Sequence, residues 1–144
     1  MKIYIRQDFC IGCHLCEVYC QLRQAQTDDL TKAFKRGASR PLSRLRVDEG
    51  GIVSVSIRCQ HCDEAPCMPV CPAGAITRND TTGTVEVNPE KCFGCWTCIL
   101  ACPFGAIRRD TIQRKAVKCD LCAGEDIPLC VVNCPNGALV YAET

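Results

Sequence analysis

Short alternations of apolar and polar residues recur along this chain, and they predict small β-strands rather than one long sheet. Residues 2–7 alternate around Ile3 and Ile5, which predicts a strand at the beginning of the chain. Two alternating runs between residues 45 and 57 flank Gly50-Gly51, a pattern typical of a hairpin with a glycine turn. Further short strands are expected at residues 76–78, 85–87, 106–109, 116–117 and 137–141.

Helical segments are expected to be equally short. Gln21 rather than Pro follows Cys20, so a helix can continue through Glu17 to Arg23. Within residues 24–46, Thr27 or Asp28 is expected to cap a short helix, because their side-chain oxygens accept hydrogen bonds from free backbone amides. The pattern therefore predicts an α+β chain whose elements are too small to bury much apolar surface by themselves.

Four runs of cysteine interrupt these elements. The clearest run has the spacing C-x2-C-x2-C-x3-C-P, which is the bacterial ferredoxin run for a [4Fe–4S] cluster. The first run has the same spacing without the Pro, and in the second and fourth runs the third cysteine is delayed. In chain order the runs are Cys10, Cys13, Cys16, Cys20; Cys59, Cys62, Cys67, Cys71; Cys92, Cys95, Cys98, Cys102; and Cys119, Cys122, Cys130, Cys134.

The last cysteine of three runs begins an internal repeat. The signature Cys-Pro-x-Gly-Ala-aliphatic occurs at residues 71–76, 102–107 and 134–139. Such a repeat predicts one structural unit of cysteine run, short helical turn and strand, used several times. Gly permits the turn, and the aliphatic residue is expected to pack under a cluster.

Cysteine content separates three classes of protein. The chain has 144 residues, of which 16 are Cys, and this density is typical either of a disulfide scaffold or of metal sites. Disulfides give no reason for three cysteines at C-x2-C-x2-C spacing. A zinc-stabilised binding module is the more serious alternative, although zinc knuckles usually come as two separated C-x2-C pairs. Sixteen cysteines in four groups of four instead match four [4Fe–4S] clusters.

Composition says less about partners. The net charge of +1 indicates neither nucleic acid nor a membrane surface as a partner. The first residues have no apolar signal segment, and no apolar run approaches membrane-spanning length. We therefore expect a cytoplasmic protein with reduced thiols.

The whole chain resembles the four-cluster iron–sulfur electron-transfer subunits of dimethyl sulfoxide reductase, formate dehydrogenase and hydrogenase systems. The resemblance rests on all four cysteine runs, on the delayed third cysteine of two of them, and on the phrase Lys118-Cys119-Asp120-Leu121-Cys122. It implies two ferredoxin-like units, each with two clusters as its core. The outer unit is expected at 1–23 plus 116–144, the inner unit at 52–115, and a surface insertion at 24–46.

In this family the last cysteine of each run binds a cluster of another run. Carried over by position, the resemblance implies four ligand sets. Cluster 1 takes Cys10, Cys13, Cys16 and Cys134; cluster 2 takes Cys119, Cys122, Cys130 and Cys20; cluster 3 takes Cys59, Cys62, Cys67 and Cys102; and cluster 4 takes Cys92, Cys95, Cys98 and Cys71. The spacing of the runs alone does not decide this nesting.

A cluster with four thiolates has no open coordination position, so it changes oxidation state without binding substrate. The sequence also has no nucleophile–base set and no dinucleotide fingerprint. We therefore expect an electron-transfer subunit, not an enzyme by itself. Residues 10–17 and 32–35 look most like the small iron–sulfur proteins of carbon monoxide dehydrogenase or aldehyde oxidoreductase, which have a flavin NAD(P)H oxidoreductase as second partner. A hydrogenase- or formate-dehydrogenase-linked subunit is the alternative, and an iron–sulfur enzyme or sensor is disfavoured by the full ligand complement.

Several residues near the cysteines have two interpretations. Lys118 either raises the potential of a neighbouring cluster or is a solvated surface lysine. His14 and His61 are expected at the surface or behind the ligands, and Trp96 beside a cluster or at a subunit contact. The basic residues of segment 32–46 either dock an acidic partner or are simply solvated.

Overall fold

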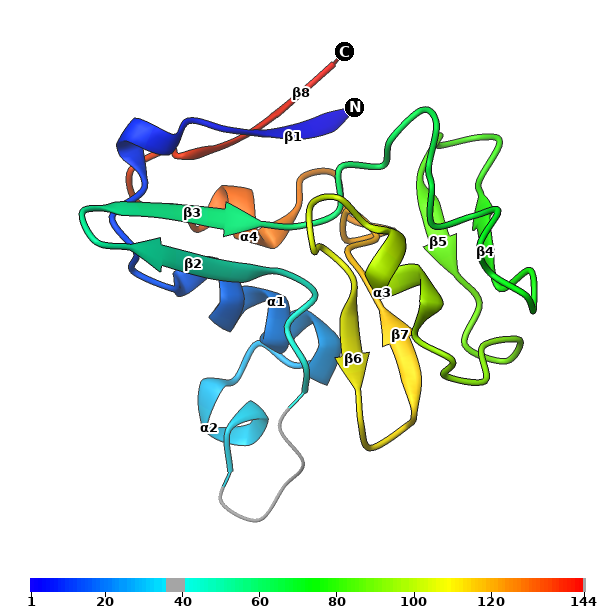
Figure 1. Ribbon diagram of the computed structural model, residues 1–144. Helices are drawn as coiled ribbons and strands as arrows, with labels where there is room; N and C mark the ends of the chain where they lie inside the picture. Colours follow the sequence, from blue (N-terminus) through cyan, green and yellow to red (C-terminus); the bar gives the residue numbers. More distant parts are fainter. Residues whose placement is uncertain (36–40, 144) are drawn as a thin grey trace.

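The computed structural model describes residues 1–35 and 41–143 and contains four separate two-stranded antiparallel sheets (Figure 1). Their pairs are β1 (Lys2–Ile5) with β8 (Leu139–Ala142), β2 (Arg46–Gly50) with β3 (Val53–Ile57), β4 (Ile76–Arg78) with β5 (Val85–Val87), and β6 (Arg108–Asp110) with β7 (Lys115–Val117). The predicted α+β class with short helices and small hairpins is confirmed. An isolated two-stranded hairpin is at best marginally stable in water, so these sheets need something else to pack against.

Helices are few and short in the described chain. They are the 3₁₀ turn η1 (Gln7–Phe9) and the α-helices α1 (Leu15–Ala25), α2 (Leu30–Ala33), α3 (Thr97–Ala101) and α4 (Leu129–Val132). α1 packs against α4, which joins the first cysteine run to the last. α2 is capped by Asp29, whose carboxylate accepts hydrogen bonds from the amides of Thr31 (2.8 Å) and Lys32 (3.2 Å). The predicted caps, Thr27 and Asp28, were therefore wrong by one or two residues.

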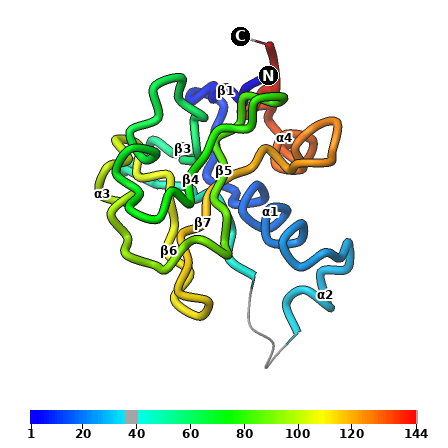
Figure 2. The backbone as a smooth tube through the Cα atoms, turned by 90° about the vertical axis from the view of Figure 1, so that its right-hand side faces the viewer, coloured from blue at the N-terminus to red at the C-terminus, as the bar shows by residue number. Residues whose placement is uncertain are grey.

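The two ends of the chain lie side by side, as both views show (Figures 1 and 2). β1 and β8 pair in register, with Ile3 opposite Tyr141. Ile3 and Leu139 are both buried in the same apolar cluster. This pairing places the last cysteine run beside the first, although the 98 residues from 21 to 118 separate them in the sequence.

The β2–β3 hairpin turns one residue later than predicted. Gly50 is the last residue of β2 and pairs with Val53, so the loop consists of Gly51 and Ile52. Gly51 has φ of +67°, a left-handed conformation that favours glycine. The predicted Gly50-Gly51 turn was therefore wrong in its register, because only the second glycine has the conformation that the turn requires.

Two buried apolar clusters form the interior of the described chain. The first combines Ile3, Leu45, Leu121 and Leu139 with buried cysteines of the first and fourth runs. The second combines Ile76, Val85 and Ile107 with buried cysteines of the second and third runs. Cysteine sulfur thus occupies positions that large aliphatic or aromatic side chains fill in ordinary cores, and the candidate metal sites lie at these positions.

Candidate iron–sulfur centres

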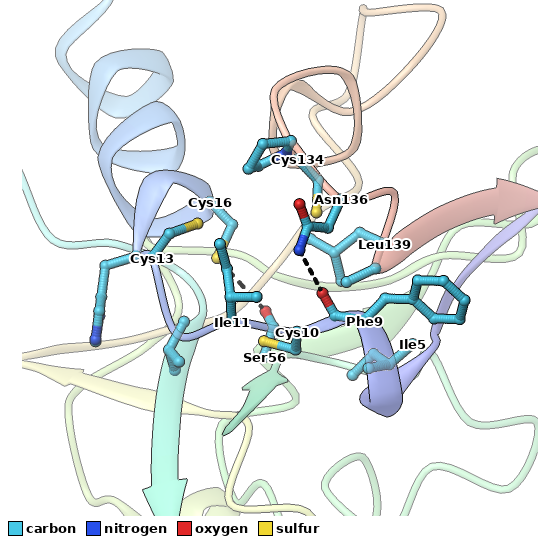
Figure 3. Close-up of a pocket in the computed structure, with 14 residues that line it drawn as sticks. Ile5, Phe9, Cys10, Ile11, Cys13, Cys16, Ser56, Cys134, Asn136 and Leu139 are labelled. Carbon is cyan, nitrogen blue, oxygen red and sulfur yellow. Dashed lines mark hydrogen bonds between the residues drawn. The ribbon is translucent and has the colours of Figure 1, made fainter. Parts of the chain in front are cut away.

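Four cysteines from opposite ends of the chain surround one cavity (Figure 3). Cys10 and Cys13 come from the loop that leads into α1, Cys16 from the first turn of α1, and Cys134 from the turn before β8. The other walls of the cavity are mainly apolar, including Ile5, Phe9 and Leu139. The structure therefore brings together the four thiols predicted for cluster 1.

Two further cavities are lined by two of the other crossed sets. Cys71 joins Cys92, Cys95 and Cys98 around one of them, together with the Trp96 side chain. The other cavity is lined by Cys59, Cys62, Cys67 and Cys102. In each case three thiols come from one run and the fourth from its neighbour, as in the sets predicted for clusters 4 and 3.

The remaining thiols lie deeper. Cys20 of α1 and Cys130 of α4 are buried, as are Cys119 and Cys122. The pKa of Cys119 is raised to about 12, chiefly by burial and also by the neighbouring Cys20 and Cys122. The pKa of Cys130 is also raised, first by burial and then by Cys119, Cys122 and Cys20. Cys20, Cys119 and Cys130 lie in the same buried apolar cluster, and Cys122 is close enough to affect the pKa of Cys119 and Cys130.

Thiols in this environment need positive charge to ionise. Burial raises the pKa of both Cys16 and Cys98 to about 11, so neither would be a thiolate in water at neutral pH without a partner. Iron provides such a partner, because a coordinating thiol is deprotonated outright. The donor set therefore fits a metal cluster, whose assembly releases protons and is favoured by rising pH.

The arrangement of these thiols suits a cluster better than a single ion. Within residues 1–35 and 41–143, no three His, Cys, Asp or Glu side chains are grouped closely enough to hold one metal ion. Zinc would need its four sulfurs at about 2.3 Å from a common point. A [4Fe–4S] cluster instead binds each thiolate to a different iron, so its ligands are spread around a larger body.

Backbone amides donate to several of the sulfurs. Ala75 donates to Cys71 Sγ (N–S 3.3 Å) and Ala106 to Cys102 Sγ (3.4 Å), both through the Cys-Pro-x-Gly-Ala repeat. In the repeat the Gly amide also donates to the Cys carbonyl oxygen, and Gly74 and Gly105 each have φ of +56°. The repeat is therefore a tight turn that aims an amide at sulfur, which explains why the sequence keeps Gly and a small residue there.

A second recurring conformation lies inside the runs. The residue two positions after the first cysteine has a positive φ in all four: Gly12 (+65°), His61 (+48°), Gly94 (+76°) and Leu121 (+56°). His61 and Leu121 use this conformation to donate their amides to Cys59 Sγ (3.3 Å) and Cys119 Sγ (3.4 Å). Glycine suits this conformation at Gly12 and Gly94, whereas nothing in the sequence marks His61 and Leu121 as left-handed.

Lys118, directly before the fourth run, and His61, inside the second run, are both buried, with 3% of each exposed. The Lys118 ammonium donates to the carbonyl oxygen of Val85, and its side chain lines the cavity of Cys59, Cys62, Cys67 and Cys102. The interpretation of Lys118 as a solvated lysine was therefore wrong. Burial and, second, the Lys118 charge lower the pKa of His61 to about 4. The ring is therefore neutral at pH 7, and its Nδ1 accepts a hydrogen bond from the Val85 amide (2.9 Å).

His14 and Trp96 occupy equivalent places in two runs. Each follows a second cysteine and has a positive φ, +58° and +66°. The His14 ring bonds to Glu17 (2.7 Å) and Glu49 (3.1 Å), and these carboxylates, Glu17 first, raise its pKa. Trp96 lies beside the cavity of Cys92 and stacks under the Arg109 guanidinium at 4.7 Å.

Comparison with known proteins agrees with this chemistry. Residues 52–144 match the family model described as "4Fe-4S dicluster domain". This chain belongs to the 4Fe-4S dicluster domain family. It is therefore a ferredoxin-type protein that carries [4Fe–4S] clusters, as its cysteine runs predicted. Within the described part of this dicluster protein, no helix has both the length and the apolar character needed to cross a membrane.

Relatives of this dicluster protein include proteins of similar and of much greater length. "Electron transport protein HydN" of Escherichia coli (strain K12) is 38% identical over 150 residues, an alignment that covers 93% of this chain and 83% of HydN. The AegA protein of the same strain is 38% identical over 138 residues, and there the match covers 90% of this chain but 20% of AegA. Among solved structures, a chain of the "Active site complex BamBC of Benzoyl Coenzyme A reductase in complex with Zinc" has a TM-score of 0.52 and 27% identity, covering 99% of this chain and 80% of that chain.

Proposed function

We propose that this chain is an electron-transfer subunit that relays single electrons through four [4Fe–4S] clusters held by the ligand sets of clusters 1 to 4. The observation that carries the proposal is the lining of three separate cavities, each by four thiols drawn from two cysteine runs. The buried thiols of Cys20, Cys119, Cys122 and Cys130 supply the fourth set. The name of HydN, an electron transport protein, supports the same function.

Four thiolates fill the protein-facing positions of each cluster, so the clusters are expected to change oxidation state without binding substrate. Reduction adds negative charge, and the amides that donate to Cys59, Cys71, Cys102 and Cys119 stabilise that charge. The protein thereby supplies binding, orientation and electrostatics, and the clusters supply the redox chemistry. The chain is proposed to have no catalytic activity by itself.

The clusters are proposed to form two units, an outer unit at 1–23 plus 116–144 and an inner unit at 52–115. The two buried apolar clusters, one with cysteines of the first and last runs and one with cysteines of the middle runs, support this division. Leu45 and Val47 pack with the first of them, so part of the β2–β3 hairpin is proposed to belong to the outer unit.

Electrons are proposed to enter and leave at clusters 1 and 4. Cys13 and Cys95 are the two exposed cysteines of the described chain, and they belong to these two sets. Exposed apolar side chains lie in the same loops, Ile11 (63% exposed) beside Cys13 and Phe93 (63% exposed) beside Cys95. Such side chains suit docking of redox partners close to a cluster.

One proposed partner is a catalytic oxidoreductase subunit of the carbon monoxide dehydrogenase or aldehyde oxidoreductase type. The second is a redox protein such as a flavin NAD(P)H oxidoreductase. The alternative is a hydrogenase- or formate-dehydrogenase-linked complex. Likeness to a chain of the BamBC active site complex supports a position beside a catalytic subunit but does not select among these partners.

The basic segment 32–46 contributes less to docking than its charge suggests. Arg44 forms an ion pair with Asp120, and Arg46 binds Asp48 through Nε (2.9 Å) and Nη2 (3.1 Å). Arg36 and Arg40 lie outside the described residues. Docking by this segment therefore rests on exposed Lys32 and Lys35 and on Arg36. Charge reversal at Lys35 and Arg36 that leaves complex formation and its salt dependence unchanged would exclude it.

The proposed function is tested by anaerobic purification of the chain with its native partners. About sixteen iron atoms and sixteen acid-labile sulfides per chain are expected, four of each per cluster. The isolated chain should accept about four electrons in a reductive titration, and it should restore electron flow between the co-purified partners. A colourless zinc protein, or turnover of a substrate by the chain alone, would refute the proposal.

Gly94→Ala is expected to impair cluster 4 selectively. A Cβ at Gly94 would lie 2.3 Å from the carbonyl oxygen of Arg114, and its φ of +76° adds about 1–2 kcal/mol of backbone strain for a non-glycine residue. Iron content should fall by about one cluster in four, and the thermal midpoint should drop. Gly74→Ala is the matched control, because Gly74 also has a positive φ (+56°) but has open space around it. Equal iron content in both variants would contradict the steric explanation.

A further inference from the structure

Arg58 is a buried cation at the junction of the two cysteine-rich cores. It stands between the end of β3 at Ile57 and the first cysteine of the second run, Cys59. Only 1% of the residue is exposed, and it is among the most buried large side chains of the described chain. Its Nε and Nη1 atoms are buried and have no hydrogen-bond partner within residues 1–35 and 41–143.

Cys59, the residue after Arg58, packs against the buried apolar cluster that contains Cys16, Cys119 and Cys130. Burial lowers the pKa of Arg58, and the thiols of Cys119, Cys130, Cys59 and Cys16 oppose that effect when ionised. Cys119 and Cys130, the two strongest of these influences, belong to the set predicted for cluster 2. The other two belong to clusters 3 and 1, so the cysteines near Arg58 come from three of the four ligand sets.

A buried charge is tolerated when an opposite charge or hydrogen bonds compensate it. A [4Fe–4S] cluster with four thiolates carries net negative charge, which becomes more negative on reduction. Cluster 2 has the most buried thiols of the chain, and burial by itself disfavours the more highly charged, reduced form. A cation beside such a cluster therefore stabilises the state that burial penalises.

Lys118 is a second buried cation, and it lies beside a different ligand set. Its ammonium lines the cavity of Cys59, Cys62, Cys67 and Cys102, and it influences Cys67 directly by lowering its pKa against the opposing effect of burial. His61, which neighbours both cations, is neutral and adds no third charge. The two buried cations thus serve different sets, Arg58 mainly cluster 2 and Lys118 cluster 3.

We propose that Arg58 is the internal counter-charge of cluster 2, holding the reduction potential of this buried cluster high enough to accept electrons from its neighbours. Arg58 acts as a positioning residue through the electrostatic field, because it ligates no iron. The inference rests on the proposed four-cluster function. It also explains why a guanidinium is kept in the interior with two nitrogen atoms that bond to no described residue.

The test is a potentiometric titration of the holoprotein, monitored by electron paramagnetic resonance, for wild type and for Arg58→Gln, Arg58→Lys and Lys32→Met. Iron and sulfide are counted first for every variant. In Arg58→Gln, one titration wave should move to lower potential. At the wild-type midpoint its reduced-to-oxidised ratio should fall at least tenfold, and a tenfold fall corresponds to a shift of about 59 mV for one electron. Arg58→Lys keeps the charge and should titrate like wild type.

Lys32→Met is the matched control, because it removes one positive charge from a side chain that is 77% exposed. Solvent screens that charge, so its titration should not differ from wild type. A fully loaded Arg58→Gln protein with unchanged waves would overturn the inference and leave the four-cluster function standing. If Arg58→Gln binds no clusters, the Arg58→Lys variant decides. Reduction potentials equal to those of wild type support the counter-charge. A tenfold fall in the reduced-to-oxidised ratio of one wave at the wild-type midpoint refutes it. Wild-type protein without four clusters would instead refute the proposed function.

Discussion

Removal of iron and sulfide is expected to unfold this protein. The buried apolar residues of the described chain include seven cysteines and six alanines, whereas none of its Phe, Tyr or Trp residues is buried. Four sheets of two strands each have no stability of their own. Once the clusters are removed, the thiols that line three cavities would lose their only strong cross-links, because small domains with thin cores depend on metals for folding.

Circular dichroism and denaturant titration of anaerobically reduced, metal-free protein provide the measurement. In the metal-free protein, the circular dichroism signal should change gradually over the whole range of denaturant concentration, without a cooperative transition. The holoprotein should unfold in one cooperative transition. Reconstitution with iron and sulfide should restore that transition. A cooperative, native-like transition in the metal-free protein would show that the apolar clusters suffice without metal.

Cys102→Ala is expected to expose the cysteines of another run rather than those of its own. Cys102 follows Cys92, Cys95 and Cys98 in sequence, but it lines the cavity of Cys59, Cys62 and Cys67. Loss of this thiolate should therefore destabilise cluster 3. Alkylation of the anaerobic protein followed by peptide mass spectrometry should find Cys59, Cys62 and Cys67 modified, with the other cysteines of the third run protected.

Cys71→Ala is the reciprocal variant. Cys71 lines the cavity of Cys92, Cys95 and Cys98, so these three thiols should become reactive when it is removed. Iron content should fall by about one cluster in each variant. Modification of the substituted cysteine's own run in both proteins would mean that each run binds its own cluster, and the crossed assignment would be abandoned.

Much of the local structure follows from short-range sequence signals. The hairpins at β4–β5 and β6–β7 and the helix after Cys16 lie where alternation and the missing Pro predicted them. Errors occurred where one residue decides a turn. Asp29, not Thr27 or Asp28, caps α2, and the β2–β3 loop begins at Gly51. Caps and turns depend on the φ angles of single residues. Neighbouring residues of similar chemistry are equally suited to these positions, so the sequence does not choose between them.

The cysteine spacing by itself determined the chemistry: thiolate ligands in groups of four, a turn at each Cys-Pro-x-Gly-Ala repeat, and a protein built around [4Fe–4S] clusters. These features lie within a few residues of each other, where chain geometry limits what the thiols can do. Only the tertiary structure brought Cys134 beside Cys10 and buried Arg58 and Lys118 between the runs. Such positions depend on the pairing of β1 with β8 and on the packing of α1 against α4, long-range contacts that no local spacing specifies.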